Sequence, residues 1–183
     1  MTFFRNLLLI GTVGILLINC SSLGTKNKAP DLESAVKTIA ADLKNQFVAS
    51  AKSQGGKMPG RLGILNIVNG DGSKSQLGGI LTDKLTKELF DPNVFILLER
   101  DRLNRVVSEQ TFQESGLVLS DQVISLGKLS GAEYLLLGQI LFEDQDFLLN
   151  LRIVSLAGVI LATTEVRFDS NDETFSKFRE RIQ

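Results

Sequence analysis

The chain has 183 residues, a formal net charge of −1, a single cysteine and neither histidine nor tryptophan. This length supplies one domain with its own hydrophobic core, and the near-neutral charge without a basic stripe argues against a nucleic-acid partner. The lack of histidine removes the commonest general base and a common metal ligand, so we expect no enzyme, no metal site and no cofactor.

The N-terminus is typical of a bacterial export signal. Arg5 precedes an uncharged run over residues 7–18, which is shorter than the roughly 20 residues of a membrane-spanning helix. The run ends in the sequence LINC, at the single cysteine, Cys20. This ending resembles the lipobox of bacterial lipoproteins, although Asn19 stands where that motif usually has Gly, Ala or Ser. The alternative is a plain N-terminal anchor with an incidental Cys20.

The lipobox resemblance implies a processed and anchored protein. Residues 1–19 are then a cleaved signal peptide, and Cys20 carries acyl chains such as palmitate. Residues 20–30 form the lipidated cysteine and a polar tether (SSLGTKNKAP), and residues 31–183 form a single domain. Ser21 is not the aspartate that retains enteric lipoproteins at the inner membrane. The resemblance therefore favours lipid anchoring in the outer membrane, with the domain facing the periplasm.

The first half of the domain predicts two helices and two strands. Asp31 can cap a helix whose apolar residues recur every three or four positions to about Lys52. The mostly apolar residues 61–68 predict one buried strand, and the sequence of residues 94–98 (VFILL) predicts another. Between them, leucines at four-residue intervals from Leu77 to Leu89 predict the second amphipathic helix.

The middle of the domain predicts two further helices. One begins after Asp101, and the other begins after Ser120 and Asp121. Gly131 follows the second helix closely, as expected where a helix ends in a left-handed residue.

The last third predicts an antiparallel meander. Three strand-like runs cover residues 132–142, 147–155 and 159–168, with short polar or glycine-containing turns between them. Alternation of polar and apolar residues in the second and third runs predicts one lightly covered face. Asn171 or Asp172 can then cap a short C-terminal helix. We therefore expect an α/β (α+β) fold: a mixed sheet of about five strands ending in an antiparallel meander, with helices packed on it.

Two loops carry polar residues that could serve as ligand sites. Residues 69–75 (NGDGSKS) lack the glycine that a Walker motif needs before Lys74, and they lack the glycine and glutamate of a calcium loop. We interpret this segment as a turn followed by a helix cap. Glu143, Asp144 and Asp146 at a hairpin tip could recruit a cation, but we interpret this tip as solvated.

Two segments carry a family resemblance. ILLERDRLNRVVSEQTFQESGLV and LGKLSGAEYLLLGQI resemble the CsgG superfamily of bacterial lipoproteins, and the likeness extends over about residues 60–168. The matching residues are Glu99, Arg100, Glu109, Gln110, Gly116, Gly127, Gly131 and Gly138. We interpret these residues as specifying the fold or an interface rather than a catalytic site.

The resemblance is strongest to the small FlgO-like branch, which lacks the transmembrane hairpins of the curli secretion channel. It implies a lipid-anchored periplasmic envelope protein acting as a non-catalytic assembly or interaction module, with a flagellar or secretion-related role. The implied partners are the membrane through the lipid, other envelope proteins and further copies in a homo-oligomer. A channel subunit, an activator of a peptidoglycan synthase and an unrecognised enzyme are the alternatives.

Overall fold

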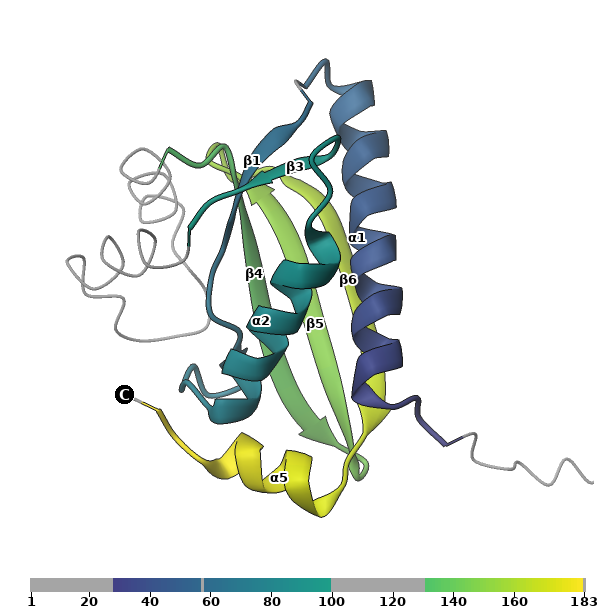
Figure 1. Ribbon diagram of the computed structural model, residues 1–183, viewed down its shortest axis with the longest axis vertical. Helices are drawn as coiled ribbons and strands as arrows, with labels where there is room; N and C mark the ends of the chain where they lie inside the picture. The colour runs from purple at the N-terminus through teal and green to yellow at the C-terminus, as the bar shows by residue number, and fades with distance from the viewer. Residues whose placement is uncertain (1–27, 57, 100–130, 183) are drawn as a thin grey trace, which may run out of the picture.

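The computed structural model describes residues 28–56, 58–99 and 131–182 (Figure 1). In chain order, the elements described are α1 (Leu32–Ser53), β1 (Gly60–Ile64), β2 (Val68–Asn69), α2 (Gln76–Leu89), β3 (Phe95–Leu97), β4 (Tyr134–Glu143), β5 (Asp146–Ser155), β6 (Ile160–Asp169) and α5 (Asp172–Arg179). The two helices predicted after Asp101 and Asp121 lie outside the described residues. No helix in the described part of the chain is both long and apolar enough to span a bilayer.

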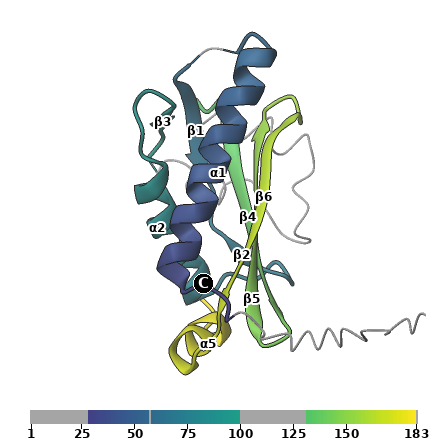
Figure 2. The same ribbon diagram turned by 90° about the vertical axis from the view of Figure 1, so that its right-hand side faces the viewer.

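The elements form two layers, with α1 and α2 packed against one face of a single sheet (Figures 1 and 2). The strand order is β3-β1-β4-β5-β6, and β2 pairs with β4 beyond the end of β1. β1 runs parallel to β3 and β4, whereas β4, β5 and β6 form an antiparallel meander. The predicted mixed sheet with its final meander is therefore confirmed, with six strands in place of about five.

The predicted single strand over residues 61–68 is wrong, because β1 and β2 are separate. Between them the backbone leaves the regular ladder, and the Ile67 N–H donates to the Thr82 hydroxyl of α2 at 3.0 Å. Gly78, in the first turn of α2, lies directly against the Ile67 carbonyl. Between β1 and β2, Ile67 therefore bonds to α2 and not to a neighbouring strand through its N–H.

α1 begins and ends as its sequence predicts, and it also protects an edge of the sheet. The Asp31 side chain accepts from the Ser34 N–H at 2.8 Å. Further along α1, the Ser50 hydroxyl donates to the carbonyl of Leu161, and Gln46 accepts from the backbone N–H of Thr163. Side chains of α1 therefore satisfy backbone groups of the edge strand β6, which limits unwanted strand pairing there.

The meander has one buried and one partly exposed face, as its alternating sequence predicts. On β5, Phe147, Leu149, Leu151 and Ile153 are buried towards the helices, while Arg152 and the other intervening residues are only half-buried. The turn from β4 to β5 has two residues with positive φ, 52° and 71°, which suits a tight hairpin.

α5 closes the end of the core where β4 and β5 meet. Asn171 caps it through a reciprocal capping box with Thr174, which settles the choice between Asn171 and Asp172. None of its residues is fully buried, but Phe175 packs on Phe142 with ring centroids 4.9 Å apart. Phe178 packs on the buried ring of Phe147 at 5.2 Å.

Candidate functional site

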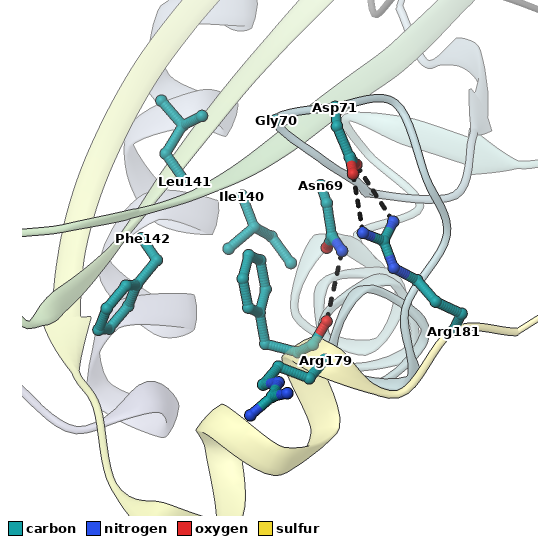
Figure 3. Close-up of a pocket in the computed structure, with 9 residues that line it drawn as sticks. Asn69, Gly70, Asp71, Ile140, Leu141, Phe142, Arg179 and Arg181 are labelled. Carbon is teal, nitrogen blue, oxygen red and sulfur yellow. Dashed lines mark hydrogen bonds and ion pairs between the residues drawn. The ribbon is translucent and has the colours of Figure 1, made fainter.

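A cavity of about 420 Å³ lies where the ends of β2 and β4 meet α5 (Figure 3). Its lining residues are Asn69, Gly70, Asp71, Ile140, Leu141, Phe142, Phe178, Arg179 and Arg181. The apolar part comes from β4 and from Phe178 of α5, and the polar part comes from the end of β2, the loop after it, the end of α5 and the C-terminal segment.

The buried amide of Asn69 is fully used in holding the structure together. Its nitrogen donates to the Ser73 hydroxyl at 3.2 Å and to the Phe178 carbonyl at 3.3 Å. Its oxygen accepts from the Ser75 hydroxyl at 2.8 Å. Ser75 in turn accepts from the Gly78 N–H and so caps α2. The turn and helix cap predicted for residues 69–75 are confirmed, and Asn69 joins them to the end of α5.

Asp71 and Arg181 neutralise each other across the mouth of the cavity. The two guanidinium nitrogens lie 2.8 Å and 3.3 Å from the carboxylate oxygens (Figure 3). A hydrogen bond from the Ser73 hydroxyl, the Arg181 guanidinium and a hydrogen bond from the Ser73 backbone N–H hold the pKa of Asp71 well below its usual range. Backbone bonds from Gln76 to Glu180 and from Ile182 to Lys74 fasten the C-terminal segment beside the pair.

This pair predicts a small pH-dependent contribution to stability. The folded-state pKa of Asp71 lies below that of the unfolded chain, so the ionised carboxylate stabilises the fold above pH about 4, and this contribution is lost as the pH falls further. The free-energy difference between wild type and Asp71→Asn should therefore shrink as the pH falls from 5 towards 2, measured by urea denaturation at each pH. It should be modest because both side chains are more than half exposed, at 57% and 55%.

Arg181→Gln is the companion variant for this prediction. It removes the guanidinium and leaves the Ser73 hydrogen bonds, so we expect part of the pH dependence to persist. A wild-type advantage over Asp71→Asn that is the same at every pH would contradict the assignment.

The motif residues predicted from the sequence do not gather at the cavity where they are described. Glu99 is exposed beyond the end of β3, and Gly131 precedes β4 with a φ of +78°. Gly138 lies within β4, where a Cβ atom would come within 2.7 Å of the side chains of Ile67 and Leu151. Neither Glu99 nor either glycine lines the cavity. Gly138 therefore has a packing role, and interface roles for the motif residues stay predictions.

The remaining predicted site residues are Cys20, Arg100, Glu109, Gln110, Gly116 and Gly127, all outside the described residues. At the acidic hairpin tip, Glu143 pairs with Arg167 at 3.6 Å. Among residues 28–56, 58–99 and 131–182, no group of three or more acidic or cysteine side chains is placed to hold a metal ion.

Sequence reasoning missed the contribution of the C-terminal segment to this site. Arg181 and Phe178 meet the loop after β2 across more than a hundred residues, and no local pattern reports such a contact. The helix cap at Asn171 predicts where α5 begins in the sequence, but it does not predict which part of the sheet α5 packs against.

One protein-family model matches part of this chain. The family model described as "Curli production assembly/transport component CsgG" matches residues 66–147. A search of curated proteins by sequence found no match.

Three solved structures share the fold at low identity. The C-terminal domain of LpoB from Escherichia coli aligns with a TM-score of 0.55 and 13% identity, covering 75% of this chain and 98% of that one. The NMR structure of E. coli LpoB gives 0.56 and 13%, covering 93% and 84%. The Salmonella enterica domain gives 0.53 and 15%, covering 71% and 97%. Identities this low show a common fold alone. Through the family-model match, the predicted resemblance to the CsgG superfamily is confirmed, and residues 66–147 are the part of the chain that carries it.

Proposed function

We propose that the chain is a lipid-anchored envelope protein whose domain works by binding other proteins rather than by catalysis. The observation that carries this proposal is the way the N-terminal segment joins the domain. The Asp169 N–H donates to the Pro30 carbonyl at 2.8 Å, and Lys28 pairs with the Asp169 carboxylate at 3.3 Å. Residues 28–30, which follow the predicted tether in the sequence, are therefore held at one end of the sheet, and a tether from Cys20 would enter the domain there.

The state of the cavity supports a non-catalytic role. Its one carboxylate, Asp71, has a lowered pKa and is paired with Arg181. A general base that works near neutral pH needs the opposite shift, towards pH 7. Asn69 is likewise occupied by Ser73, Ser75 and the Phe178 carbonyl. These polar groups fasten the C-terminal segment to the fold, which is a structural task.

The anchor is tested by the intact mass of the protein purified from membranes in mild detergent. The expected mass is that of residues 20–183 carrying three acyl chains, as the lipobox resemblance implies. A chain that retains residues 1–19 without acyl groups would overturn the lipid-anchor proposal and leave the plain N-terminal anchor.

Outer-membrane sorting is tested by a single substitution beside the lipid. In an enteric host, the wild-type chain is expected in outer-membrane fractions of a density gradient. Ser21→Asp places the retention residue directly after Cys20, and this variant should move to the inner-membrane fractions. Wild-type protein in the inner-membrane fractions would contradict the assignment.

Activation of a peptidoglycan synthase is the second candidate function. The family resemblance implies this role for similar small lipoprotein domains. The fold is consistent with it, because the alignment covers 98% of the LpoB C-terminal domain. The test is the rate of glycan-strand synthesis by a purified synthase of the same cell with and without the full-length chain in detergent. A higher rate favours this role, and no binding together with an unchanged rate would exclude it.

A further inference from the structure

We propose that Asn69 is a deamidation site whose reaction is controlled by the docking of α5 and of the C-terminal segment, residues 180–182. Asn69 is the only asparagine in the sequence that is followed by glycine. Deamidation begins when the backbone nitrogen of the next residue attacks the side-chain amide. Glycine hinders this attack least, because it has no side chain. The Asn69-Gly70 pair is therefore the position where this sequence favours deamidation most, and the fold holds the pair in an unreactive state.

The reaction needs no reactant except water. The Gly70 nitrogen forms a bond to Cγ of Asn69, the bond from Cγ to Nδ2 breaks, and ammonia leaves with the proton from the Gly70 nitrogen. Water then opens the resulting cyclic succinimide at either of its carbonyl groups. The product at position 69 is aspartate or isoaspartate, and in isoaspartate the main chain runs through the former side chain.

Three hydrogen bonds fix the Asn69 amide in the folded protein. Its nitrogen donates to the Ser73 hydroxyl at 3.2 Å and to the Phe178 carbonyl at 3.3 Å. Its oxygen accepts from the Ser75 hydroxyl at 2.8 Å. The residue is 4% exposed, which limits the access of water. Ring closure must break these bonds, because Cγ has to turn towards the Gly70 nitrogen.

The backbone on both sides of the reacting bond is also held. Asn69 lies in β2 opposite Ile140 of β4, and its N–H donates to the Ser73 carbonyl at 2.8 Å. The Gly70 carbonyl accepts from the Gln139 side chain at 3.1 Å. Ring closure requires rotation of the backbone between Asn69 and Gly70, and these bonds oppose that rotation. The native structure therefore slows the reaction at both of its reacting atoms.

Several groups that hold this loop belong to the C-terminal part of the chain. They are the Phe178 carbonyl, the Glu180 carbonyl, which accepts from the Gln76 N–H, and the Arg181 guanidinium. None of the residues of α5 is fully buried. A terminal segment with little buried surface opens at a lower free energy than the whole domain unfolds. Such local opening frees the Asn69 nitrogen from one of its acceptors and exposes the site to water.

The product opposes the return of the C-terminal segment. A carboxylate at position 69 has no N–H to donate, so it would meet the Phe178 carbonyl as a second acceptor. Burying an unpaired charge there is costly. Isoaspartate also adds a carbon atom to the main chain of β2, which displaces the hydrogen bond to Ser75 at the α2 cap. Deamidation thus turns a reversible opening into a permanent one.

The test compares two rates in the full-length wild-type chain in mild detergent at neutral pH. The first is the deamidation rate at Asn69, followed by mass spectrometry of the tryptic peptide of residues 62–74 and compared with the same peptide free in solution. Asn66 lies in this peptide before isoleucine and is the internal control, which should stay unreacted. The second is amide hydrogen exchange at Gln76 and Ile182, whose N–H groups bond between the C-terminal segment and the α2 start.

Both reactions need the same opening, so the two degrees of protection should agree. Folding should slow deamidation by a factor within about tenfold of the factor by which it slows exchange at Gln76 and Ile182. Exchange in β5, which lies inside the sheet, should be slowed at least about tenfold more. This comparison needs no variant, so it does not depend on whether a substituted chain folds.

A double variant tests the role of the C-terminal part directly. Phe178→Ala/Arg181→Gln removes the ring that packs on Phe147 and the guanidinium that binds Asp71. Deamidation at Asn69 should be at least about threefold faster in this variant, because opening becomes easier. Lys177→Gln is the matched control on α5. It removes only the ion pair with Glu173, and its deamidation rate should equal that of wild type.

Four results would overturn the inference. They are deamidation of the folded chain as fast as that of the free peptide, protection of Asn69 as high as that of the β5 amides, equal rates in the double variant and wild type, and an equal acceleration in Lys177→Gln. The second result would mean that only global unfolding exposes the amide. Thermal unfolding of both variants shows whether the domain stays folded, and the two wild-type rates decide the question where it does not.

Discussion

Gly78→Ala is expected to lower the free energy of unfolding by about 3 kcal/mol. A Cβ atom at Gly78 would lie 2.2 Å from the Ile67 carbonyl oxygen, which is far inside van der Waals contact. Side-chain rotation cannot relieve this clash, because the contacted atom is backbone. The Ile67 backbone is also held by its bond to Thr82, and the Ile67 side chain is buried against Gly138. The first turn of α2 must therefore move away from the sheet, or Ile67 must leave its place.

Gly79 supplies the matched control for this substitution. It lies one residue further along α2, and a Cβ atom there meets nothing within 4 Å. Gly79→Ala should therefore raise the free energy of unfolding by about 0.5–1 kcal/mol, since alanine is the better helix former. Urea denaturation of both variants in a Cys20→Ser background measures the difference. Equal stability of the two variants would contradict the close approach of α2 to Ile67.

Cys20→Ser is expected to release the protein from the membrane. The lipid proposed at Cys20 is the membrane attachment that this substitution removes. A single acyl chain holds a protein only marginally, whereas two or more hold it firmly. Without the thiol no acyl chain can be added to the sulfur, so the variant loses the proposed lipid attachment. The measurement is the distribution of wild type and variant between membrane and soluble fractions after carbonate extraction without detergent.

The outcome also separates the proposed function from the channel alternative. Wild type should stay with the membrane after carbonate treatment, and Cys20→Ser should be extracted. Retention of Cys20→Ser would point to membrane-inserted segments or to an uncleaved N-terminal anchor. Replacing residues 1–19 of the variant by an export signal with an ordinary small-x-small cleavage site distinguishes these two causes, because only inserted segments of the domain would still hold the cleaved protein.

Local sequence signals predicted the elements well, and tertiary contacts decided the rest. Asp31 and Asn171 cap their helices as their residue types predict. The strands of the meander follow from alternation and turn residues, which are local properties. The break between β1 and β2 could not be predicted, since it depends on Thr82 of α2 accepting from Ile67, fifteen positions earlier in the chain.

The strand order and the contacts of the candidate site could not be predicted from the sequence. β1 lies between β3 and β4, and apolar runs in a sequence do not state which neighbours they will pair with. The sequence predicts the turn and the α2 cap at residues 69–75, and the structure confirms both; the bond between Asp71 and the C-terminal segment was not predicted. The partner of Asp71 is Arg181, 110 residues away, and only the fold brings the two together.

The central claim, an anchored domain that serves the envelope by contact, is tested most directly by complementation of a gene-deletion strain. The strain is scored for motility, secretion and envelope integrity after expression of wild type or Cys20→Ser at matched levels. We expect the deletion strain to have a defect in at least one of these properties, which wild type restores and Cys20→Ser does not. A deletion strain normal in all three, or full rescue by Cys20→Ser, would contradict it.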